Sequence, residues 1–347
     1  MTADAETSTG AGQQPWLSIL MPVYNVAPFV EECLGSILDQ LDGQPGIEVI
    51  LLDDQSTDGS AGLCQRVVAH CQSNIRLLHH GENAGPSAAR NSMLEVARGD
   101  YVWFVDADDR ILPGAIRSLQ EIAASVRPDV IMCDYVREGS ECYATFDGPE
   151  RRVSNCTETL VAGVFAKRRL HAWSRVWKRD LFGSSIRFPV GACFEDAATI
   201  PWLLLKAESF YYAAEPWVYY RSRPGSIMER LARTRSFDVR RNDDLAGALA
   251  GFHSALAEAL PDAASETMAT VARFQSREFV KIAKRLARGR KTSWTRLRTD
   301  IGRYQTVMEA HSPLPFAAVA RQYLARGKIG RAAALGLVLA VSRPERS

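Results

Sequence analysis

The chain has 347 residues, of which 46% are hydrophobic and 24% are charged, an ordinary composition for a soluble globular protein. Its net charge of +2 hides an asymmetry, because residues 277–347 hold sixteen Lys and Arg against four Asp and Glu. The length predicts about two domains, and the charge pattern predicts an acidic body followed by a basic C-terminal region.

The cysteines and the chain start bear on the compartment. Seven cysteines are scattered without a Cys-x-x-Cys pair, which excludes a recognisable zinc site or disulfide framework and fits a reducing, cytosolic location. Residues 1–14 are small and polar and lack a basic segment before an apolar run, so we expect a disordered leader rather than a signal peptide. The apolar run at 332–341 is too short to span a bilayer as a helix.

The first part of the chain alternates between apolar runs of strand length and stretches with helical periodicity. This alternation predicts a doubly wound, mostly parallel sheet, and Pro22 is expected to end the first strand. The strands are expected at 17–21, 47–52, 75–78 and 101–105, and the helices at 29–41, shortly after Asp58, and at 87–97.

Carboxylates follow two of these strands. Asp53 and Asp54 end the second strand, and Asp106, Asp108 and Asp109 follow the fourth. Ligands bind at the carboxyl ends of strands in open α/β sheets, and clustered carboxylates repel one another unless a cation lies among them. Oxygen ligands at i and i+2 suit Mg²⁺ or Mn²⁺. The alternative is a solvated acidic loop or a cap for the helix expected from Pro113.

Glycine-based nucleotide motifs are absent from the sequence. No G-x-G-x-x-G follows the first strand, and no Gly-Lys-Ser/Thr P-loop occurs anywhere. A nucleotide would therefore be bound through carboxylates and a metal ion.

The second part of the chain contains one acidic pair and then changes character. Glu195 and Asp196 precede an apolar, helix-like run at 197–205, where acidic residues also favour the first turn of a helix. Apolar residues keep helical spacing over 245–260 and again over 268–286. This spacing predicts a small helical domain with basic outer faces.

Seven motifs occur together in an order that resembles the family 2 inverting glycosyltransferases of the GT-A fold. The resemblance covers roughly residues 16–228, and nothing beyond about residue 235 is recognisable. The motifs are PVYN at 22–25, LLDDQSTDGS at 51–60, NAGPSAARN at 83–91, DADD at 106–109, WSRVWKRDLF at 173–182, RFPVGACFEDAATIP at 187–201 and YYRSRPGSI at 219–227.

The resemblance implies a domain plan and a reaction. Residues 15–234 would form a GT-A catalytic domain, and residues 235–347 a helical, basic C-terminal region. The enzyme would use Mn²⁺ or Mg²⁺ and transfer a sugar from a nucleotide-sugar, usually a UDP-sugar, with inversion. The acceptor would be a glycan or a lipid-linked molecule in cell-surface polysaccharide or envelope glycan synthesis. The oligomeric state is not determined by the sequence.

The resemblance also implies roles for individual residues. Asp196 would be the general base with Glu195 as its orienting neighbour, and Asp106 and Asp108 would hold the metal ion. Arg90 would neutralise the diphosphate or contact the base, and a surface arginine is its alternative. A histidine frequent in the family's 219–227 segment is absent, and a solvated turn is the alternative there. The donor contacts would be Pro22, Tyr24, Asp53, Asp54, Asn83, Arg90, Asp106, Ala107, Arg221, Arg223 and Ser226.

Two features have rival interpretations. Trp173 and Trp177 would either line an acceptor groove or belong to the core. Residues 312–344 contain no acidic side chain, and together with the apolar run at 332–341 they predict reversible docking on an anionic membrane at its cytoplasmic face. Packing of these leucines on the helical domain is the alternative.

Three other functions were weighed against a glycosyltransferase. A sugar-phosphate nucleotidyltransferase would need a glycine- and lysine-rich signature after the first strand, and PVYN lacks it. A non-catalytic sugar- or nucleotide-binding module would not need Asp196. A nucleic-acid binder would interleave more aromatic residues with the arginines of the basic region than Trp294 and Tyr304, so no nucleic-acid partner is expected.

Overall fold

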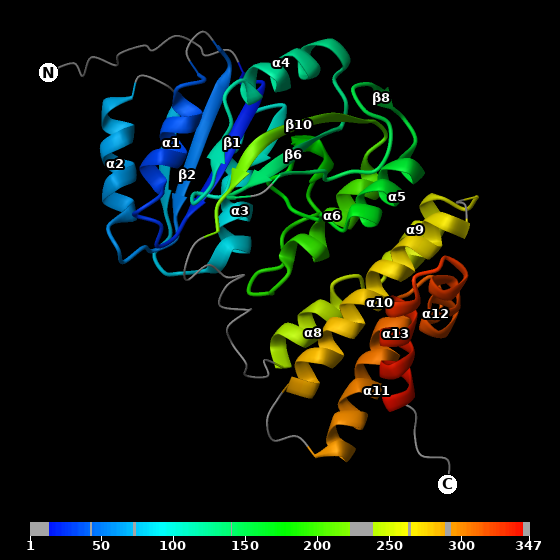
Figure 1. Cartoon of the computed structure of the whole chain (residues 1–347). Helices are drawn as coiled ribbons and strands as arrows, with labels where there is room; N and C mark the ends of the chain where they lie inside the picture. Colours follow the sequence, from blue (N-terminus) through cyan, green and yellow to red (C-terminus); the bar gives the residue numbers. More distant parts are fainter. Residues whose placement is uncertain are drawn as a thin grey trace, which may run out of the picture.

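The computed structural model describes residues 14–41, 44–71, 74–139, 141–222, 239–262, 265–288 and 293–342. An α/β body occupies the first part of the chain, and a helical region lies beside it (Figure 1). The expected leader at 1–14 lies outside the described residues except for Gln14, as does the expected domain boundary near 235.

The body is built on one ten-stranded mixed sheet, in which β3-β2-β1-β4-β9-β6-β10-β5 is the order of neighbours. The first four strands pair with one another in parallel, as the sequence predicts, whereas β9 runs antiparallel between β4 and β6. The strands are β1 (Leu17–Val23), β2 (Ile47–Asp53), β3 (Ile75–His79), β4 (Tyr101–Phe104), β5 (Arg110–Ile111), β6 (Val130–Arg137), β7 (Cys142–Tyr143), β8 (Val153–Ser154), β9 (Arg175–Lys178) and β10 (Phe210–Tyr220).

Both faces of the sheet are covered by helices. Successive strand side chains point to opposite faces, so Leu20 belongs to one core while Ile19 and Met21 belong to the other. Every residue of β2 is buried, as expected for a strand between two helix layers. The face with Ile19 is covered by α1 (Val30–Leu38), α2 (Ser60–His70) and α4 (Ala115–Val126), and the face with Leu20 by α3 (Gly85–Val96), α5 (Thr157–Lys167) and α6 (Glu195–Lys206).

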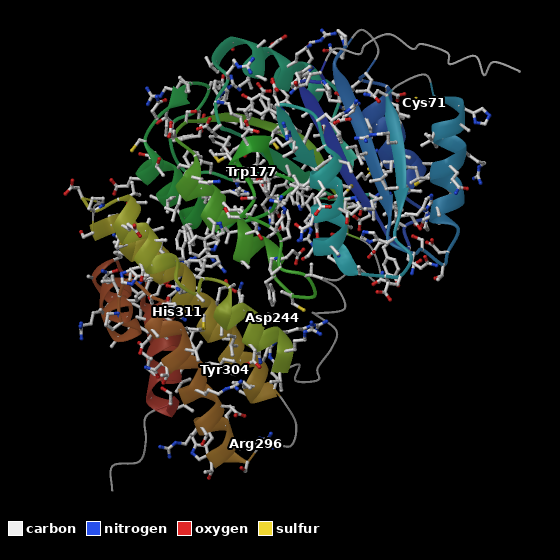
Figure 2. All side chains as sticks on the ribbon, turned by 180° about the vertical axis from the view of Figure 1, so that it is seen from behind. Cys71, Trp177, Asp244, Arg296, Tyr304 and His311 are labelled. Carbon is white, nitrogen blue, oxygen red and sulfur yellow. The ribbon has the colours of Figure 1, made fainter. Side chains whose placement is uncertain are left out.

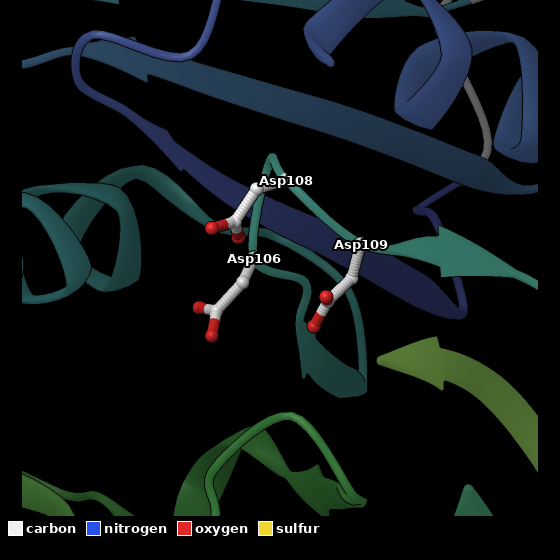
Figure 3. Close-up of side chains that lie close together, drawn as sticks. All are labelled: Asp106, Asp108 and Asp109. Atoms are coloured by element: carbon white, nitrogen blue, oxygen red, sulfur yellow. The ribbon is translucent and has the colours of Figure 1, made fainter. Parts of the chain in front are cut away.

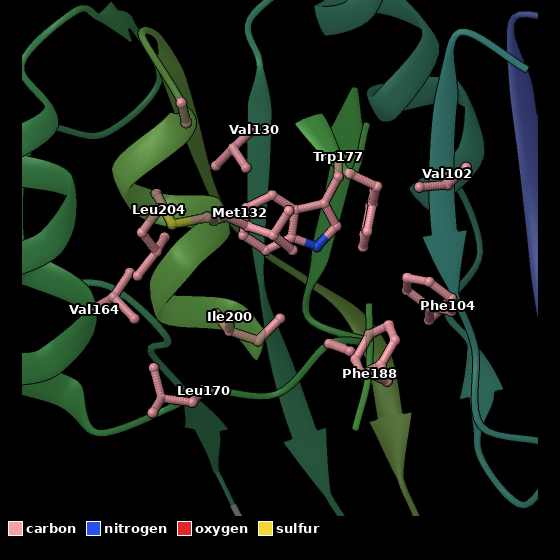
Figure 4. Close-up of a cluster of buried hydrophobic side chains, with 14 of the residues drawn as sticks. Val102, Phe104, Val130, Met132, Val164, Leu170, Trp177, Phe188, Ile200 and Leu204 are labelled. Atoms are coloured by element: carbon pink, nitrogen blue, oxygen red, sulfur yellow. The ribbon is translucent and has the colours of Figure 1, made fainter. Parts of the chain in front are cut away.

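Trp173 and Trp177 are core residues. Trp177 lies in β9 and is fully buried among apolar side chains (Figures 2 and 4). Trp173 is 5% exposed and belongs to the core on the other face, where its ring stacks between His171 and Tyr220. The alternative in which the two rings line an acceptor groove therefore finds no support.

The expectation that Pro22 ends the first strand is wrong, because β1 continues to Val23 and Pro22 pairs with Leu52. Backbone polar groups of successive strand residues face alternate neighbours. Leu20 accepts a hydrogen bond from Val105 on the β4 side, so Pro22 also faces that side. Proline has no backbone N–H group. Because β4 already ends at Phe104, its absence at Pro22 costs the sheet no hydrogen bond between strands.

The C-terminal region is helical, as predicted, and shares a core with the body. Phe165 of α5 stacks on Phe252 and meets Phe274 edge-on. A separate apolar cluster joins α8 and α10 to the last three helices. The helices are α8 (Val239–Gly247), α9 (Phe252–Ala259), α10 (Ser265–Arg288), α11 (Trp294–Ala310), α12 (Phe316–Ala325) and α13 (Ile329–Ser342).

The last helix divides the apolar run at 332–341 between core and surface. Leu335 and Leu339 are buried in the helical cluster, in agreement with the alternative that these leucines pack on the helical domain. Leu337, in contrast, is 68% exposed. Within the described parts of the chain, no helix has the length and apolarity needed to cross a bilayer.

Candidate active site

Three aspartates lie in the turn that follows β4 (Figure 3). Carboxylate oxygens of Asp106, Asp108 and Asp109 all lie within 4.8 Å of one another. Asp109 is buried, and its Oδ1 accepts a hydrogen bond of 2.8 Å from the main-chain N–H of Arg221. The expected pair, Asp106 and Asp108, is thus brought together, and Asp109 joins it.

The electrostatics of this cluster favour a cation. Burial raises the pKa of Asp109 well above its ordinary value, and the charges of Asp106 and Asp108 raise it further. Burial likewise raises the pKa of Asp106, although the nearby Arg90 opposes the rise. Asp109 Oδ2 is buried and has no hydrogen-bond partner among the described residues. Three carboxylates with one orphaned oxygen form a donor set that fits Mg²⁺ or Mn²⁺.

Arg90 on α3 connects this cluster to the other acidic motif. Its side chain is 5% exposed, and its Nη2 lies 3.3 Å from Asp106 Oδ1. Its Nη1 lies 2.8 Å from Glu195 Oε1 and 3.5 Å from Asp196 Oδ1. The three carboxylates raise the pKa of Arg90 against the effect of burial, so it stays a cation. The surface-arginine alternative is therefore wrong, because Arg90 is buried at the centre of the site.

Asp196 has the properties of a base. It lies in the first turn of α6, where Ala172 donates its main-chain N–H to Asp196 Oδ2 at 3.2 Å. Although a quarter of its side chain is exposed, burial raises the pKa of Asp196 to about 7, with Arg90 opposing the rise and Glu195 and Asp106 adding to it. A carboxylate with this pKa can exchange a proton near neutral pH.

Arg175, which the sequence analysis missed, holds the loop that carries Ala172. Its fully buried guanidinium donates to the carbonyl oxygens of His171 and Arg169 and to the Ser174 hydroxyl. Burial lowers the pKa of Arg175 to about 10. The signal was an arginine directly before the apolar Val176 and Trp177, because a buried guanidinium needs hydrogen-bond acceptors to be tolerated.

Asp54 organises the loop that leads into α3. Its carboxylate accepts hydrogen bonds from the main-chain N–H of Ala84 at 3.0 Å and of Gly85 at 2.8 Å, and His80 Nδ1 lies 2.7 Å away. Asn83 is exposed and donates through Nδ2 to the Asp54 carbonyl at 3.1 Å. These contacts place the start of α3, and with it Arg90, at the end of β2.

The remaining expected donor contacts are spread around this centre. The neighbouring Asp53 is buried and accepts from the main-chain N–H of Ser56. Pro22 is half-buried at the end of β1, Tyr24 is 43% exposed just beyond it, and Ala107 is buried within the aspartate turn.

The side chain of Arg221 contacts α1 and Phe29, which directly precedes that helix. Its guanidinium pairs with Glu32 on α1 and lies 5.0 Å from the centre of the Phe29 ring. Only its main-chain N–H reaches Asp109. Arg223 and Ser226, the other two residues expected to contact the diphosphate, lie outside the described residues.

The mixed sheet of this order, with clustered aspartates after β4 and an acidic pair at the start of α6, is a GT-A fold. The family model described as glycosyl transferase family 2 matches residues 18–174. Over these residues the chain is similar to this family, as the sequence motifs predict.

Similar proteins occur in several bacteria. Glycosyltransferase GlyG of Streptococcus pneumoniae is 29% identical over 223 residues, which are 61% of this chain and 72% of the relative. The uncharacterised glycosyltransferase EpsJ of Bacillus subtilis is 30% identical over 228 residues, covering 62% of this chain and 63% of EpsJ. The minor teichoic acid biosynthesis protein GgaA of the same species is 30% identical over 59% of this chain, which spans 47% of GgaA.

Solved structures share the fold over most of the chain. Staphylococcus aureus TarS 1–349 in complex with UDP-GlcNAc is 20% identical, with a TM-score of 0.59 over 85% of this chain and 90% of that one. Mannosyltransferase PcManGT from Pyrobaculum calidifontis, in complex with GDP-Man and Mn²⁺, is 18% identical, with a TM-score of 0.52 over 95% of this chain and 87% of that one.

Proposed function

We propose that this protein is a metal-dependent, inverting glycosyltransferase that moves a sugar from a UDP-sugar to an acceptor hydroxyl. The observation that carries the proposal is the Arg90 guanidinium, which lies between the aspartate cluster after β4 and the Glu195–Asp196 pair. A charged donor and a base must meet in one place for a single displacement, and Arg90 brings their two sites together. TarS is in complex with UDP-GlcNAc and PcManGT with GDP-Man, which supports a nucleotide-sugar as the donor.

In the proposed reaction, Asp196 accepts the proton of the acceptor hydroxyl as its oxygen attacks the anomeric carbon. The nucleoside diphosphate leaves from the opposite face, so the configuration inverts and no covalent intermediate forms on the enzyme. Glu195 holds the Arg90 guanidinium next to Asp196 through its 2.8 Å contact with Arg90. Asp106, Asp108 and Asp109 would hold Mg²⁺ or Mn²⁺, which when bound supplies positive charge for the leaving diphosphate.

The donor contacts on the β1 and β2 side are part of the same proposal. Tyr24 is exposed beyond the end of β1 and offers an aromatic face for the nucleoside base. Asp54 accepts hydrogen bonds from the main-chain N–H groups of Ala84 and Gly85, so it holds the loop that leads into α3. In the proposal it also accepts the uracil N–H. Asp53 is the second candidate for the uracil contact.

A donor screen tests the proposal. UDP-, GDP- and dTDP-sugars are incubated with Mn²⁺ or Mg²⁺, and release of free nucleoside diphosphate and thermal shift are recorded. We expect metal-dependent stabilisation and slow hydrolysis with at least one UDP-sugar. A chain that binds such a sugar but neither hydrolyses nor transfers it, with any acceptor tried, would instead be a non-catalytic binding module.

The acceptor and its location form the second part of the proposal. We infer that the acceptor is lipid-linked and that the enzyme meets it at the cytoplasmic face of an anionic membrane, in surface polysaccharide or envelope glycan synthesis. The relative GgaA is named for teichoic acid biosynthesis, which supports an envelope glycan.

An exposed surface of α12 and α13 suits such docking. Leu324, Ile329 and Leu337 are 58%, 69% and 68% exposed, and the last two lie on one face of α13 because they are eight residues apart. Exposed basic side chains lie close to them in the chain, and residues 312–344 contain no carboxylate that would repel an anionic lipid. These basic residues are Arg321, Arg326, Lys328 and Arg331.

A further inference from the structure

The helical region reaches the turn that precedes the catalytic pair. Cys193 donates its main-chain N–H to Asp244 Oδ2 on α8 at 2.9 Å. Two residues earlier, the carbonyl oxygen of Gly191 accepts a hydrogen bond of 2.6 Å from Arg240 Nη2 on the same helix. Asp244 lies where the helical region adjoins the body (Figure 2), and it falls outside the residues that the family model matches.

This turn has a backbone that needs outside support. Phe194 adopts a left-handed conformation with φ of 63°, which is costly for a residue with a Cβ. Its side chain packs against the apolar cluster of the helical region. The next two residues are Glu195 and Asp196, so the direction of the first turn of α6 depends on Phe194.

The helix that supplies Asp244 is itself firmly attached. Asn242 is buried and accepts a hydrogen bond of 2.8 Å from Arg285 Nε on α10. Asp243 Oδ1 lies 2.6 Å from Arg303 Nη2 and accepts a bond of 2.9 Å from the Tyr304 hydroxyl on α11. Asp244 therefore connects the turn before α6 to a helix that is held by two others.

We propose that Asp244 is a positioning residue, which places the Glu195–Asp196 pair by holding the strained turn at Cys193 and Phe194. The role of Asp196 in this inference rests on the proposed function. The helical region thus takes part in forming the active site. Loss of the contact would release the first turn of α6 and misplace the base, for which a fall in kcat on the order of 10- to 100-fold is expected.

Three variants test the proposal. Asp244→Ala removes the acceptor, Asp244→Asn keeps a side-chain oxygen for the Cys193 N–H, and Glu258→Ala is the control. Glu258 is an exposed carboxylate on α9, in the same helical region but on another helix than Asp244. Hydrogen–deuterium exchange of peptides covering 190–200 is measured beside kcat and the donor KM.

We expect Asp244→Ala to speed exchange in these peptides and to lower kcat with little change in KM. Asp244→Asn should keep both near the wild-type values, as should Glu258→Ala. Equal effects of Glu258→Ala and Asp244→Ala, or unchanged exchange in Asp244→Ala, would overturn the proposal. Hydrogen–deuterium exchange is measured without substrate. It therefore still tests the role of Asp244 if the proposed function proves wrong.

Discussion

The guanidinium of Arg90 and the carboxylate of Glu195 lie 2.8 Å apart, although 105 residues separate them in the chain. The same guanidinium reaches Asp106 and Asp196, so one buried cation stabilises acidic residues from two different motifs. Without it, these carboxylates would repel one another in a partly desolvated site. This arrangement explains how the chain can keep so many acidic groups together before any metal or substrate is bound.

Asp108→Ala should abolish metal-dependent binding of the donor, because it removes one of three carboxylates that lie within 4.8 Å of one another. Binding of a UDP-sugar is measured by calorimetry with and without Mn²⁺. Asp180→Ala is the matched control, since its side chain is 93% exposed and lies in another part of the chain. Equal donor affinity in wild type and Asp108→Ala, with metal present, would contradict the assignment of the metal site.

Asp196→Asn should lower turnover by on the order of 10² to 10⁴ while donor binding persists, because the amide keeps the shape of the side chain but cannot accept the proton. Single-turnover transfer and donor affinity are measured on the same preparation. A variant that transfers at nearly the wild-type rate would show that another residue is the base.

The pH dependence of kcat should have an acid limb near pH 7. Burial raises the pKa of Asp196 to about 7, and only the deprotonated carboxylate can act as the base. Activity should therefore be lost as the pH falls through about 7, roughly tenfold per unit below it, and should level off above it. The profile is recorded at saturating donor, and residual activity of Asp196→Asn should lack this limb.

Replacing Ile329 and Leu337 by Ser, and Lys328 and Arg331 by Glu, should abolish binding to anionic vesicles. Each cation near an anionic leaflet contributes about 1 kcal/mol, and the two apolar side chains add buried area. Co-sedimentation is measured with phosphatidylserine-containing and with neutral vesicles at low and high salt. These four residues are exposed, so the fold should be kept, unlike a truncation that removes the buried Leu335 and Leu339.

Arg296→Glu serves as the control for this experiment. Arg296 is an exposed cation on α11 whose side chain is 76% exposed, so its replacement changes net charge without altering the proposed surface. If the wild-type protein does not bind anionic vesicles at low salt, or if the control loses binding as the fourfold variant does, the α12–α13 surface is not the docking site.

Much of the fold follows from local patterns in the sequence. Four apolar runs of strand length become β1 to β4, and carboxylates after the second and fourth runs lie at one edge of the sheet. Apolar residues with helical spacing become α9 and α10. These features could be predicted because periodicity and the change from apolar to acidic residues are properties of neighbouring residues.

Other features depend on contacts between distant parts of the chain. The antiparallel insertion of β9 and the placement of Trp173 and Trp177 in opposite cores could not be inferred from a spacing of four that also fits a helix. The continuation of β1 through Pro22 depends on where β4 ends.

The sequence by itself determined the resemblance to the family 2 glycosyltransferases, because the seven motifs and their order can be read directly from it. Only the tertiary structure decided that Arg90 joins these motifs, that Asp109 is buried with them, and that Asp244 holds the turn before Asp196. The physical reason is that pairing, burial and the pKa of a carboxylate depend on what surrounds it in space. Those surroundings come from segments separated by tens of residues in the chain.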